Sequence, residues 1–171
     1  YPTRSFLSYN VGSFLYILFC VYLFFKRQYG GISVAHKTEA QIRYNMKRVK
    51  SKDSQIELIL RRELWKRGIR YRKNVSTILG KPDIAFLRKK VAVFCDSEFW
   101  HGYDWEHHRN DIKSHQDFWI PKIEKNIERD KIVTSQLIKE GWIVLRFWGN
   151  DIKKNPSGCA DIIEDVLRNR K

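Results

Sequence analysis

Three carboxylates stand at the ends of two short apolar runs in GKPDIAFLRKKVAVFCDSEFWHG, residues 80–102. Asp83 opens the first run, whereas Asp96 and Glu98 follow the second. An ionised carboxylate is costly to remove from water, so a strand that only needed burial would have no use for these residues. Their positions indicate a site that holds something cationic.

The two apolar runs predict how the carboxylates meet. PDIAFL and VAVFC have strand composition, and the RKK between them indicates a hairpin, which places Asp83 and Asp96 at the same edge of a sheet. Proteins hold Mg²⁺ with one or two carboxylates together with phosphate oxygens of a substrate. The pattern is typical of a magnesium-dependent phosphodiesterase. A purely structural alternative, in which Asp83 caps a turn and Asp96 ends a strand, remains open.

The charge of the chain indicates a polyanionic partner. Its 171 residues include 33 Lys and Arg against 19 Asp and Glu, which gives a formal net charge of +14. Much of this excess lies between residues 37 and 74. Nucleic acid is the expected partner and an anionic membrane surface is the alternative, although a solvated helix face also explains a run of charges. The cysteines, Cys20, Cys95 and Cys159, form no C-x-x-C pair, which fits a reducing, cytoplasmic compartment.

The first 36 residues form an extension of different composition. Its apolar run, residues 14–25, is bounded by Lys26 and Arg27 and is short for a bilayer span, which needs about 20 apolar residues. No small-residue cleavage site follows it, so a secretory signal fits poorly. Two interpretations remain open: a membrane anchor that keeps the following domain cytoplasmic, or a leader foreign to the mature protein.

Residues 37–171 predict one α/β domain. Residues 51–68 predict a helix that starts with a capping box, Ser54 and Glu57, and stops at Gly68. A long helix over 117–141 is expected to hold Pro121 in its first turn, and 142–148 and 156–171 predict a strand and a closing helix. The basic face of the first helix is expected to contact phosphates through Arg61, Arg62, Lys66 and Arg67.

Five blocks of the chain, in this order and spacing, carry a wider resemblance. TEAQIRYNMKRVKSKDSQIEL, GKPDIAF, FCDSEFWHG, DFWIPKIEKNIERD and GWIVLRFW resemble the very-short-patch repair (Vsr-type) DNA mismatch endonucleases, a branch of the PD-(D/E)XK nuclease superfamily. The resemblance covers roughly residues 38–150. It implies an α/β fold of the restriction-endonuclease-like kind, with a mixed β-sheet flanked by helices.

The reaction that this resemblance implies is a Mg²⁺-dependent nick in one strand of double-stranded DNA beside a T:G mismatch. It further implies a cytosine methyltransferase in the same pathway. We expect the protein to be a monomer. Two other functions remain open: a related nicking or restriction-like nuclease with another specificity, and a DNA-binding module without catalysis.

The resemblance also implies roles for single residues of the reaction centre. Asp83 matches the family's central metal-binding aspartate, and Cys95 stands where the family offers a backbone carbonyl to the metal. His101 matches a histidine that assists the attacking water or the phosphate, a role that suits an imidazole because it exchanges protons near neutral pH. Glu57 matches an acidic residue near the site, and its role in the capping box remains an alternative or additional one.

At two places the chain departs from the family. The best-known members carry a catalytic histidine where this chain has Asp96, which we therefore expect to be a second metal ligand, with Glu98 beside it. The family's structural zinc ligands align here with Glu98, Tyr103, Trp105 and Asn150, so we expect no structural zinc. A solvated, DNA-facing loop is favoured over a substitute zinc site for the residues Asp104, His107, His108, Asp111 and His115.

The aromatic residues match a wedge that the family inserts into the base stack next to the mismatch. Unstacking a base step costs a few kcal/mol, which a mispaired site partly waives. Core packing is the alternative, and we expect wedge use for Trp100 and Trp119 and core packing for Phe118. The full set of residues expected to contact DNA is Met46, Phe99, Trp100, Trp119, Lys122 and Asn126, of which Lys122 and Asn126 match positions that touch the mismatched bases.

Overall fold

The computed structural model describes residues 53–113 and 115–170, which belong to one compact unit bounded by Val49 and Lys171. The predicted apolar extension, its boundary at residues 36 and 37, and Met46 all lie outside the described residues. Within the described ranges, no helix is long and apolar enough to cross a membrane.

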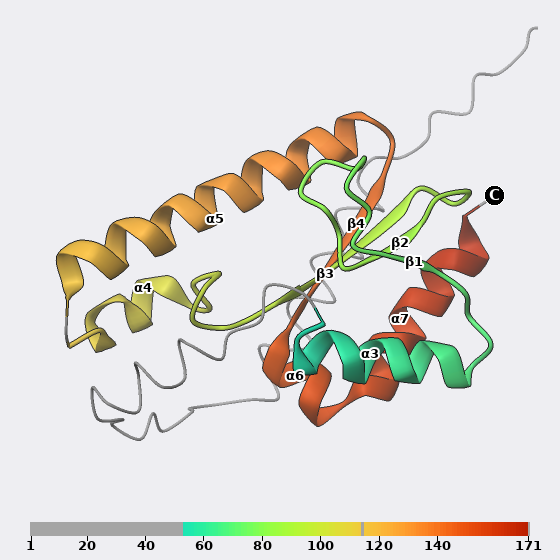
Figure 1. Cartoon of the computed structure of the whole chain (residues 1–171), viewed down its shortest axis with the longest axis horizontal. Helices are drawn as coiled ribbons and strands as arrows, with labels where there is room; N and C mark the ends of the chain where they lie inside the picture. The colour runs from blue at the N-terminus through green and yellow to red at the C-terminus, as the bar shows by residue number, and fades with distance from the viewer. Residues whose placement is uncertain (1–52, 114, 171) are drawn as a thin grey trace, which may run out of the picture. The chain divides into compact units, whose positions relative to one another are not determined.

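A mixed sheet forms the centre of this unit (Figure 1). Its strands are β1 (Arg72–Lys73), β2 (Ile84–Phe86), β3 (Val91–Asp96) and β4 (Ile143–Trp148), and they lie side by side in that order. The first three strands pair antiparallel, whereas β3 and β4 pair parallel. The hairpin of β2 and β3 and the third apolar strand are confirmed. The two-residue strand β1 was not expected.

Successive residues of each strand face opposite sides of the sheet, and both faces are covered. One face carries larger side chains, such as Phe86 and Val93, and packs on α3 (Gln55–Lys66), α6 (Gly149–Lys154) and α7 (Pro156–Asn169). The other carries Ala85, Ala92 and Phe94 and packs on Val133 and Leu137 of the long helix α5 (Gln116–Lys139). The mixed sheet between helices confirms the predicted fold class.

Helix α3 begins as the sequence predicts. Ser54 and Glu57 form the capping box: the hydroxyl of Ser54 accepts from the Glu57 N–H, and the Glu57 carboxylate accepts from the Ser54 N–H at 3.1 Å. Gly68 follows the helix with φ +74°, which favours glycine because it has no Cβ. Apolar residues such as Leu60 and Leu64 on one side of α3 are buried against the sheet.

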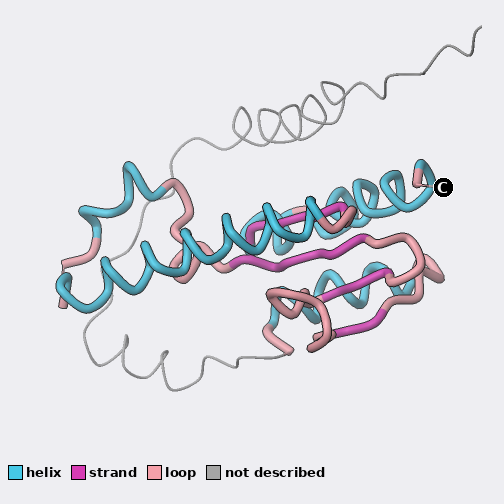
Figure 2. Tube along the Cα trace, turned by 90° about the horizontal axis from the view of Figure 1, so that it is seen from above, coloured by secondary structure: helices cyan, strands magenta, loops and turns pink. Residues whose placement is uncertain are grey.

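Helix α5 reaches beyond the sheet. Its first half extends past the strands and lies beside the short helix α4 (Trp105–His108) and a 3₁₀ turn (Arg109–Asp111), as Figures 1 and 2 show. The Glu124 carboxylate holds the two together by accepting from Trp105 Nε1 at 3.4 Å and from Arg109 Nε at 3.0 Å. The helix starts at Gln116, so Pro121 lies in its second turn, whereas the sequence predicted the first. In the second turn, the missing N–H of proline removes one backbone hydrogen bond.

The expectation of a uniformly basic face on α3 is wrong for two of its four residues. Arg61 is only 5% exposed and pairs with Asp53 at 2.6 Å and Glu57 at 2.8 Å. Arg67 contacts a carboxylate of α3 and two of α7, so it joins the two helices. Arg62 and Lys66 are exposed. Carboxylates of the protein therefore pair with two of the four cations that the sequence offered to phosphates.

Candidate active site

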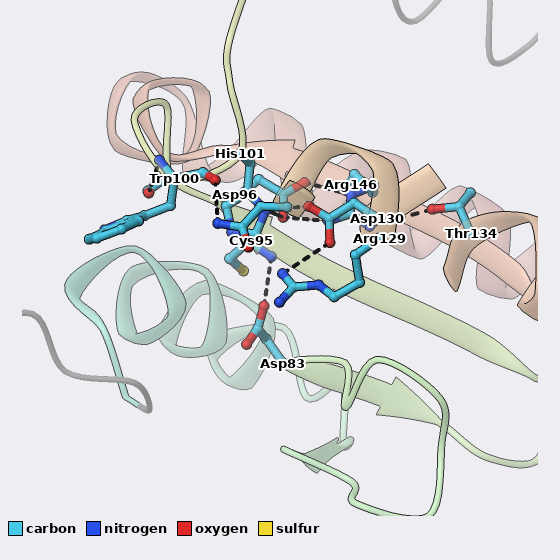
Figure 3. A network of polar contacts seen from close by, with 11 residues as sticks. Asp83, Cys95, Asp96, Trp100, His101, Arg129, Asp130, Thr134 and Arg146 are labelled. Atoms are coloured by element: carbon cyan, nitrogen blue, oxygen red, sulfur yellow. Dashed lines mark hydrogen bonds and ion pairs between the residues drawn. The ribbon is translucent and has the colours of Figure 1, made fainter. Parts of the chain in front are cut away.

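The β2–β3 hairpin brings Asp83 to the end of β3. Its Oδ2 accepts a hydrogen bond from the backbone N–H of Cys95 at 2.7 Å, so the carboxylate is fixed next to the backbone of this strand (Figure 3). The predicted meeting of Asp83 with the end of the next strand is confirmed. The thiol of Cys95 is a poor metal ligand here, because burial raises its pKa well above the usual value and keeps it protonated. Only its backbone is suited to the role expected from the sequence.

Asp83 lies in an environment that lacks a direct counter-charge. Burial raises the pKa of its carboxyl to about 6, and the negative charges of Glu57 and Asp96 add to the rise, whereas the Cys95 N–H and Arg61 oppose it. No cationic side chain of the described residues forms an ion pair with this carboxylate. A cation bound here would relieve the repulsion among three neighbouring acidic groups, so the surroundings of Asp83 are suited to a metal ion.

Glu57 and Arg61 support Asp83 from α3. Arg61 donates to the backbone carbonyl of Asp83 at 2.8 Å while pairing with Glu57, and Glu57 is itself only 5% exposed. The Glu57 carboxylate also accepts from Ser54 Oγ and from two backbone N–H groups. Its contacts are those of the capping-box alternative together with an ion pair, so Glu57 lies near Asp83 but its oxygens are already engaged.

Asp96 has a different set of partners. The guanidinium of Arg146 on β4 binds its carboxylate with two parallel hydrogen bonds, Nε to Oδ2 at 2.6 Å and Nη2 to Oδ1 at 2.9 Å. Asp96 is 4% exposed, and such a buried carboxylate requires a partner of this kind. A metal at Asp96 would have to compete with Arg146. The role of second metal ligand stays a prediction.

His101 lies next to this ion pair. Asp130 on α5 accepts from Nδ1 of His101 at 2.6 Å, and the Asp96 carboxylate lies 3.5 Å from the same nitrogen. A carboxylate can only accept, so Nδ1 carries the proton and a neutral ring leaves Nε2 with a free lone pair. Burial alone would raise the pKa of Asp130, but the His101 hydrogen bond and the charge of Arg146 bring it below the ordinary value.

Arg146 connects these groups into one network, which Figure 3 shows running from Asp96 through Arg146 to Asp130 and His101. Nη2 of Arg146 also lies 3.3 Å from the Asp130 carboxylate, and Nη1 donates to Thr134 Oγ1 at 3.4 Å. Its guanidinium covers the Phe94 ring at 4.7 Å. The network borders an open pocket of about 710 Å³ between α5 and β4, whose walls include Ile127, Lys131, Ile138 and Trp148.

Glu98 contacts the start of α6. Its carboxylate accepts from the backbone N–H of Asn150 in the first turn of α6, where a negative charge is favoured by the free N–H groups of the helix. Asn150 thus contributes backbone rather than a zinc ligand. The two members of the expected acidic pair thus have different partners: Asp96 binds Arg146, and Glu98 binds the start of α6.

The histidine-rich segment forms α4 and the 3₁₀ turn, not the loop expected from the sequence, and its histidines make individual pairs. His107 bonds to Asp104 and His108 to Asp111, each through Nδ1 at 2.7 Å. Across 53–113 and 115–170, no three His, Cys, Asp or Glu side chains are arranged to hold a metal ion. The absence of structural zinc stays a prediction.

The rings of Phe99, Trp100, Phe118 and Trp119 gather into one cluster. Trp100 and Trp119 lie 5.6 Å apart at their ring centroids, with Phe99 and Phe118 packed edge-on against them. Phe118 is 55% exposed and Phe99 45%, so the expectation that Phe118 belongs to the core is wrong. The two tryptophans are half-buried beneath the more exposed phenylalanines. A cluster of exposed rings on a basic protein is suited to stacking against bases.

Lys122 and Asn126 lie beside this cluster. Nζ of Lys122 lies between 5.2 and 5.7 Å from the centroids of Phe118, Trp100 and Trp119. Asn126 donates to the backbone carbonyl of Trp100 at 3.1 Å and thereby fixes the aromatic loop on α5. The same loop also lies close to α5 at Gly102, because a Cβ there would lie 2.4 Å from Cδ1 of Ile127.

Sequence reasoning missed Asp130, Arg146 and Arg61. Asp130 was part of the quoted block DFWIPKIEKNIERD but had no role, and Arg146 interrupts the otherwise apolar run WIVLRFW. A charged residue inside a continuously apolar strand was the available signal, because such a residue needs a buried partner. Arg61 had no signal of its own, since it belongs to a run of basic residues on α3.

Comparison with known proteins identifies the family. Residues 35–107 match the family model of the DNA mismatch endonuclease Vsr. The chain is 49% identical over 134 residues to the type II nicking enzyme V.NmeDIP of Neisseria meningitidis serogroup C, covering 78% of this chain and 90% of that enzyme. It is 54% identical over 121 residues to the type II nicking enzyme V.HpaIIP of Haemophilus parainfluenzae, covering 71% and 86%.

A more distant relative carries the family name. Over 107 residues the chain is 33% identical to the DNA mismatch endonuclease Vsr of Escherichia coli K12, covering 61% of this chain and 66% of that protein. The hairpin-held Asp83, the neighbouring His101 and the cluster of exposed rings agree with this similarity. The chain therefore belongs to the Vsr family, and it is a DNA endonuclease.

Proposed function

We propose that this endonuclease nicks one strand of double-stranded DNA beside a T:G mismatch and that it requires Mg²⁺. The observation that carries the proposal is the carboxylate of Asp83, which the β2–β3 hairpin fixes against the Cys95 backbone without a cationic partner among the described residues. The family and the names of the relatives, which are nicking and mismatch enzymes, support it further.

The donors at this position fit Mg²⁺. The ion needs only one or two carboxylates from the protein, because water and phosphate oxygens complete its shell. Asp83 and the backbone carbonyl of Cys95 would hold it. Burial, together with the charges of Glu57 and Asp96, raises the Asp83 pKa to about 6, and a cation there would stabilise the ionised carboxylate. When bound, Mg²⁺ stabilises the charge that develops on the phosphate and on the leaving oxygen.

The proton transfer is assigned to His101. With Nδ1 bonded to Asp130, Nε2 of the neutral ring accepts a proton from water as the water oxygen attacks phosphorus. The new P–O bond forms, the P–O bond to the leaving sugar oxygen breaks, and that oxygen is protonated by solvent. Asp130 holds the ring in the tautomer that this step needs.

Recognition of the mismatch is assigned to the aromatic cluster. A ring can stack where bases separate, and a T:G pair opens at lower cost than a matched pair. Trp119 and Trp100 supply the rings, and Lys122 stands where its charge can reach the DNA. The exposed basic residues of α3 supply affinity that does not depend on sequence.

The experiment that tests this function compares duplexes that carry one T:G or one T:A pair, with a different dye on each strand. With Mg²⁺ we expect single-turnover cleavage of one strand, faster at T:G than at T:A, and no cleavage in EDTA. Equal cleavage of both duplexes would contradict recognition of the mismatch and would favour a nickase that recognises a DNA sequence. Binding without cleavage in Mg²⁺, checked on supercoiled plasmid, would leave a DNA-binding module.

The role of the rings is tested on the same duplexes. Stacking contributes about 1 to 3 kcal/mol per base, so Trp119→Ala is expected to lower the T:G to T:A rate ratio by about tenfold or more. Trp65→Ala is the matched control, because Trp65 is also exposed but lies on α3 against Arg70, outside the aromatic cluster. Survival of the preference in Trp119→Ala would assign recognition to other residues.

A further inference from the structure

Arg146 is half-buried, in a position that a charged residue enters only with partners. It occupies the β4 position that pairs with Phe94 of β3, on the face of the sheet that α5 covers. Burial lowers the pKa of its guanidinium, but the hydrogen bonds and charges of Asp96 and Asp130 more than offset this effect. Arg146 is therefore a fixed cation between two carboxylates from different elements.

The donors of Arg146 are nearly all occupied. Nε and Nη2 bind Asp96, Nη2 also lies 3.3 Å from Asp130, and Nη1 donates to Thr134. Arginine has five N–H donors, so little capacity remains for a phosphate. The guanidinium is arranged to hold protein groups, which distinguishes it from an arginine that binds DNA.

The two carboxylates that Arg146 holds both face His101. Asp130 accepts from Nδ1 at 2.6 Å and Asp96 lies at 3.5 Å from the same atom. Two carboxylates that approach the same nitrogen repel each other, and the repulsion is stronger in a half-buried site than in water. Without the guanidinium, Asp130 would be free to turn toward Arg129, a 59% exposed side chain that already lies 3.4 Å from its other oxygen.

We propose that Arg146 is a positioning residue, which Asp96 anchors and which holds the Asp130 carboxylate on Nδ1 of His101 so that Nε2 faces the attacking water. Asp96 thus acts through Arg146, a role different from that of the metal ligand expected from the sequence. The inference rests on the proposed function of His101 as the proton acceptor.

The geometric part is tested without turnover, in metal-free protein by proton and ¹⁵N NMR of the His101 side chain. The wild type should show a hydrogen-bonded Nδ1–H signal that exchanges slowly with water. In Arg146→Met this signal should broaden or vanish. Arg129→Met is the matched control, because it removes the exposed arginine on the same carboxylate and should leave the signal in place. An unchanged signal in Arg146→Met overturns the proposal.

The kinetic part uses Asp96→Asn, Arg146→Met and their double variant, with circular dichroism to confirm folding. Each single variant should lower the single-turnover nicking rate by about 10- to 100-fold, and the Kd for DNA should change less than about twofold. The double variant should be no slower than the slower single variant, because both act through one contact. Losses that multiply, or a Kd that rises as much as the rate falls, overturn the proposal.

Arg146→Lys covers the case in which Arg146→Met does not fold. A lysine keeps the charge but cannot form two parallel bonds to Asp96 while reaching Asp130, so the slow rate and the lost Nδ1–H signal should persist. Rescue of both by lysine would show that charge alone suffices, which overturns the positioning role. If the wild type itself does not nick DNA, the proposed function fails, whereas the NMR result still decides where Arg146 holds Asp130.

Discussion

Two carboxylates at the end of one hairpin have opposite surroundings. Asp96 is bound by the two-pronged guanidinium of Arg146, whereas Asp83 accepts a single backbone N–H and has acidic neighbours. Both are aspartates at the edge of the same pair of strands, and the sequence alone gives them equal claims to a metal. Their partners distinguish them. Asp96 already has a cationic partner in the protein, which suits a structural role, whereas Asp83 has acidic neighbours and no cationic partner among the described residues, which suits the binding of a cation.

The largest expected effect is loss of activity on changing Asp83. Asp83→Asn removes the charge that would hold Mg²⁺, and the loss of several kcal/mol of charge stabilisation corresponds to a rate decrease on the order of a thousandfold. The Kd for DNA, measured by fluorescence anisotropy, should stay within about twofold because the exposed basic residues are unchanged. Mg²⁺-dependent nicking by the purified variant at near the wild-type rate would remove Asp83 from the metal site.

The same substitution should stabilise the metal-free fold. The Asp83 pKa is about 6 in the folded protein against an ordinary value of 3.8, so between these values the folded state binds more protons than the unfolded state. Stability therefore falls as the pH rises from about 4 to about 6, by up to about 3 kcal/mol. Asp83→Asn should lack this fall and be the more stable protein at neutral pH in urea unfolding. A variant less stable than wild type at neutral pH would show that burial and the acidic neighbours do not disfavour the charge of Asp83.

Asp96→Asn should shift stability in the opposite direction. It removes the charge that Arg146 binds and leaves a half-buried guanidinium with weaker partners, at a cost of about 2 kcal/mol. Urea unfolding of Asp83→Asn and Asp96→Asn at neutral pH, both without metal, measures the difference directly. If both variants change the free energy of unfolding with the same sign, the contrast between Asp83 and Asp96 is contradicted.

The distinction between partnered and unpartnered charges extends to the arginines of α3. Arg62 is exposed without a partner among the described residues, so Arg62→Met should lower the salt slope of DNA binding by about one and leave stability unchanged. Arg67→Met should leave the slope unchanged and lower stability by about 1 kcal/mol, because Arg67 joins α3 to α7. Equal salt slopes for the two variants would show that contact with a carboxylate does not withdraw an arginine from DNA.

Local signals account for what could be predicted from the sequence. The capping box of Ser54 and Glu57, the stop at Gly68 and the apolar runs of β2 and β3 each depend on residues close together in the chain. The hairpin then placed Asp83 correctly, because a short connection determines which residues face each other. The family resemblance added His101 and the aromatic cluster.

The rest depends on contacts between distant residues. Arg146 lies 50 residues from Asp96, and Asp130 lies 29 residues from His101, so no local pattern reveals that these residues form one network. The place of Arg61 beside the site was hidden for the same reason, because it donates to the backbone carbonyl of Asp83, which lies 22 residues away in the chain. The two-residue strand β1 is too short to show any periodicity.

The most direct test of the contrast between Asp83 and Asp96 is Mg²⁺ binding by calorimetry, without DNA, for the wild type, Asp83→Asn and Asp96→Asn. If Asp83 holds the ion and Asp96 holds Arg146, Asp83→Asn should lose measurable binding. Asp96→Asn should bind within about threefold of wild type, since it changes only the nearby field. Loss of binding in Asp96→Asn with binding retained in Asp83→Asn would reverse the two roles and contradict the account.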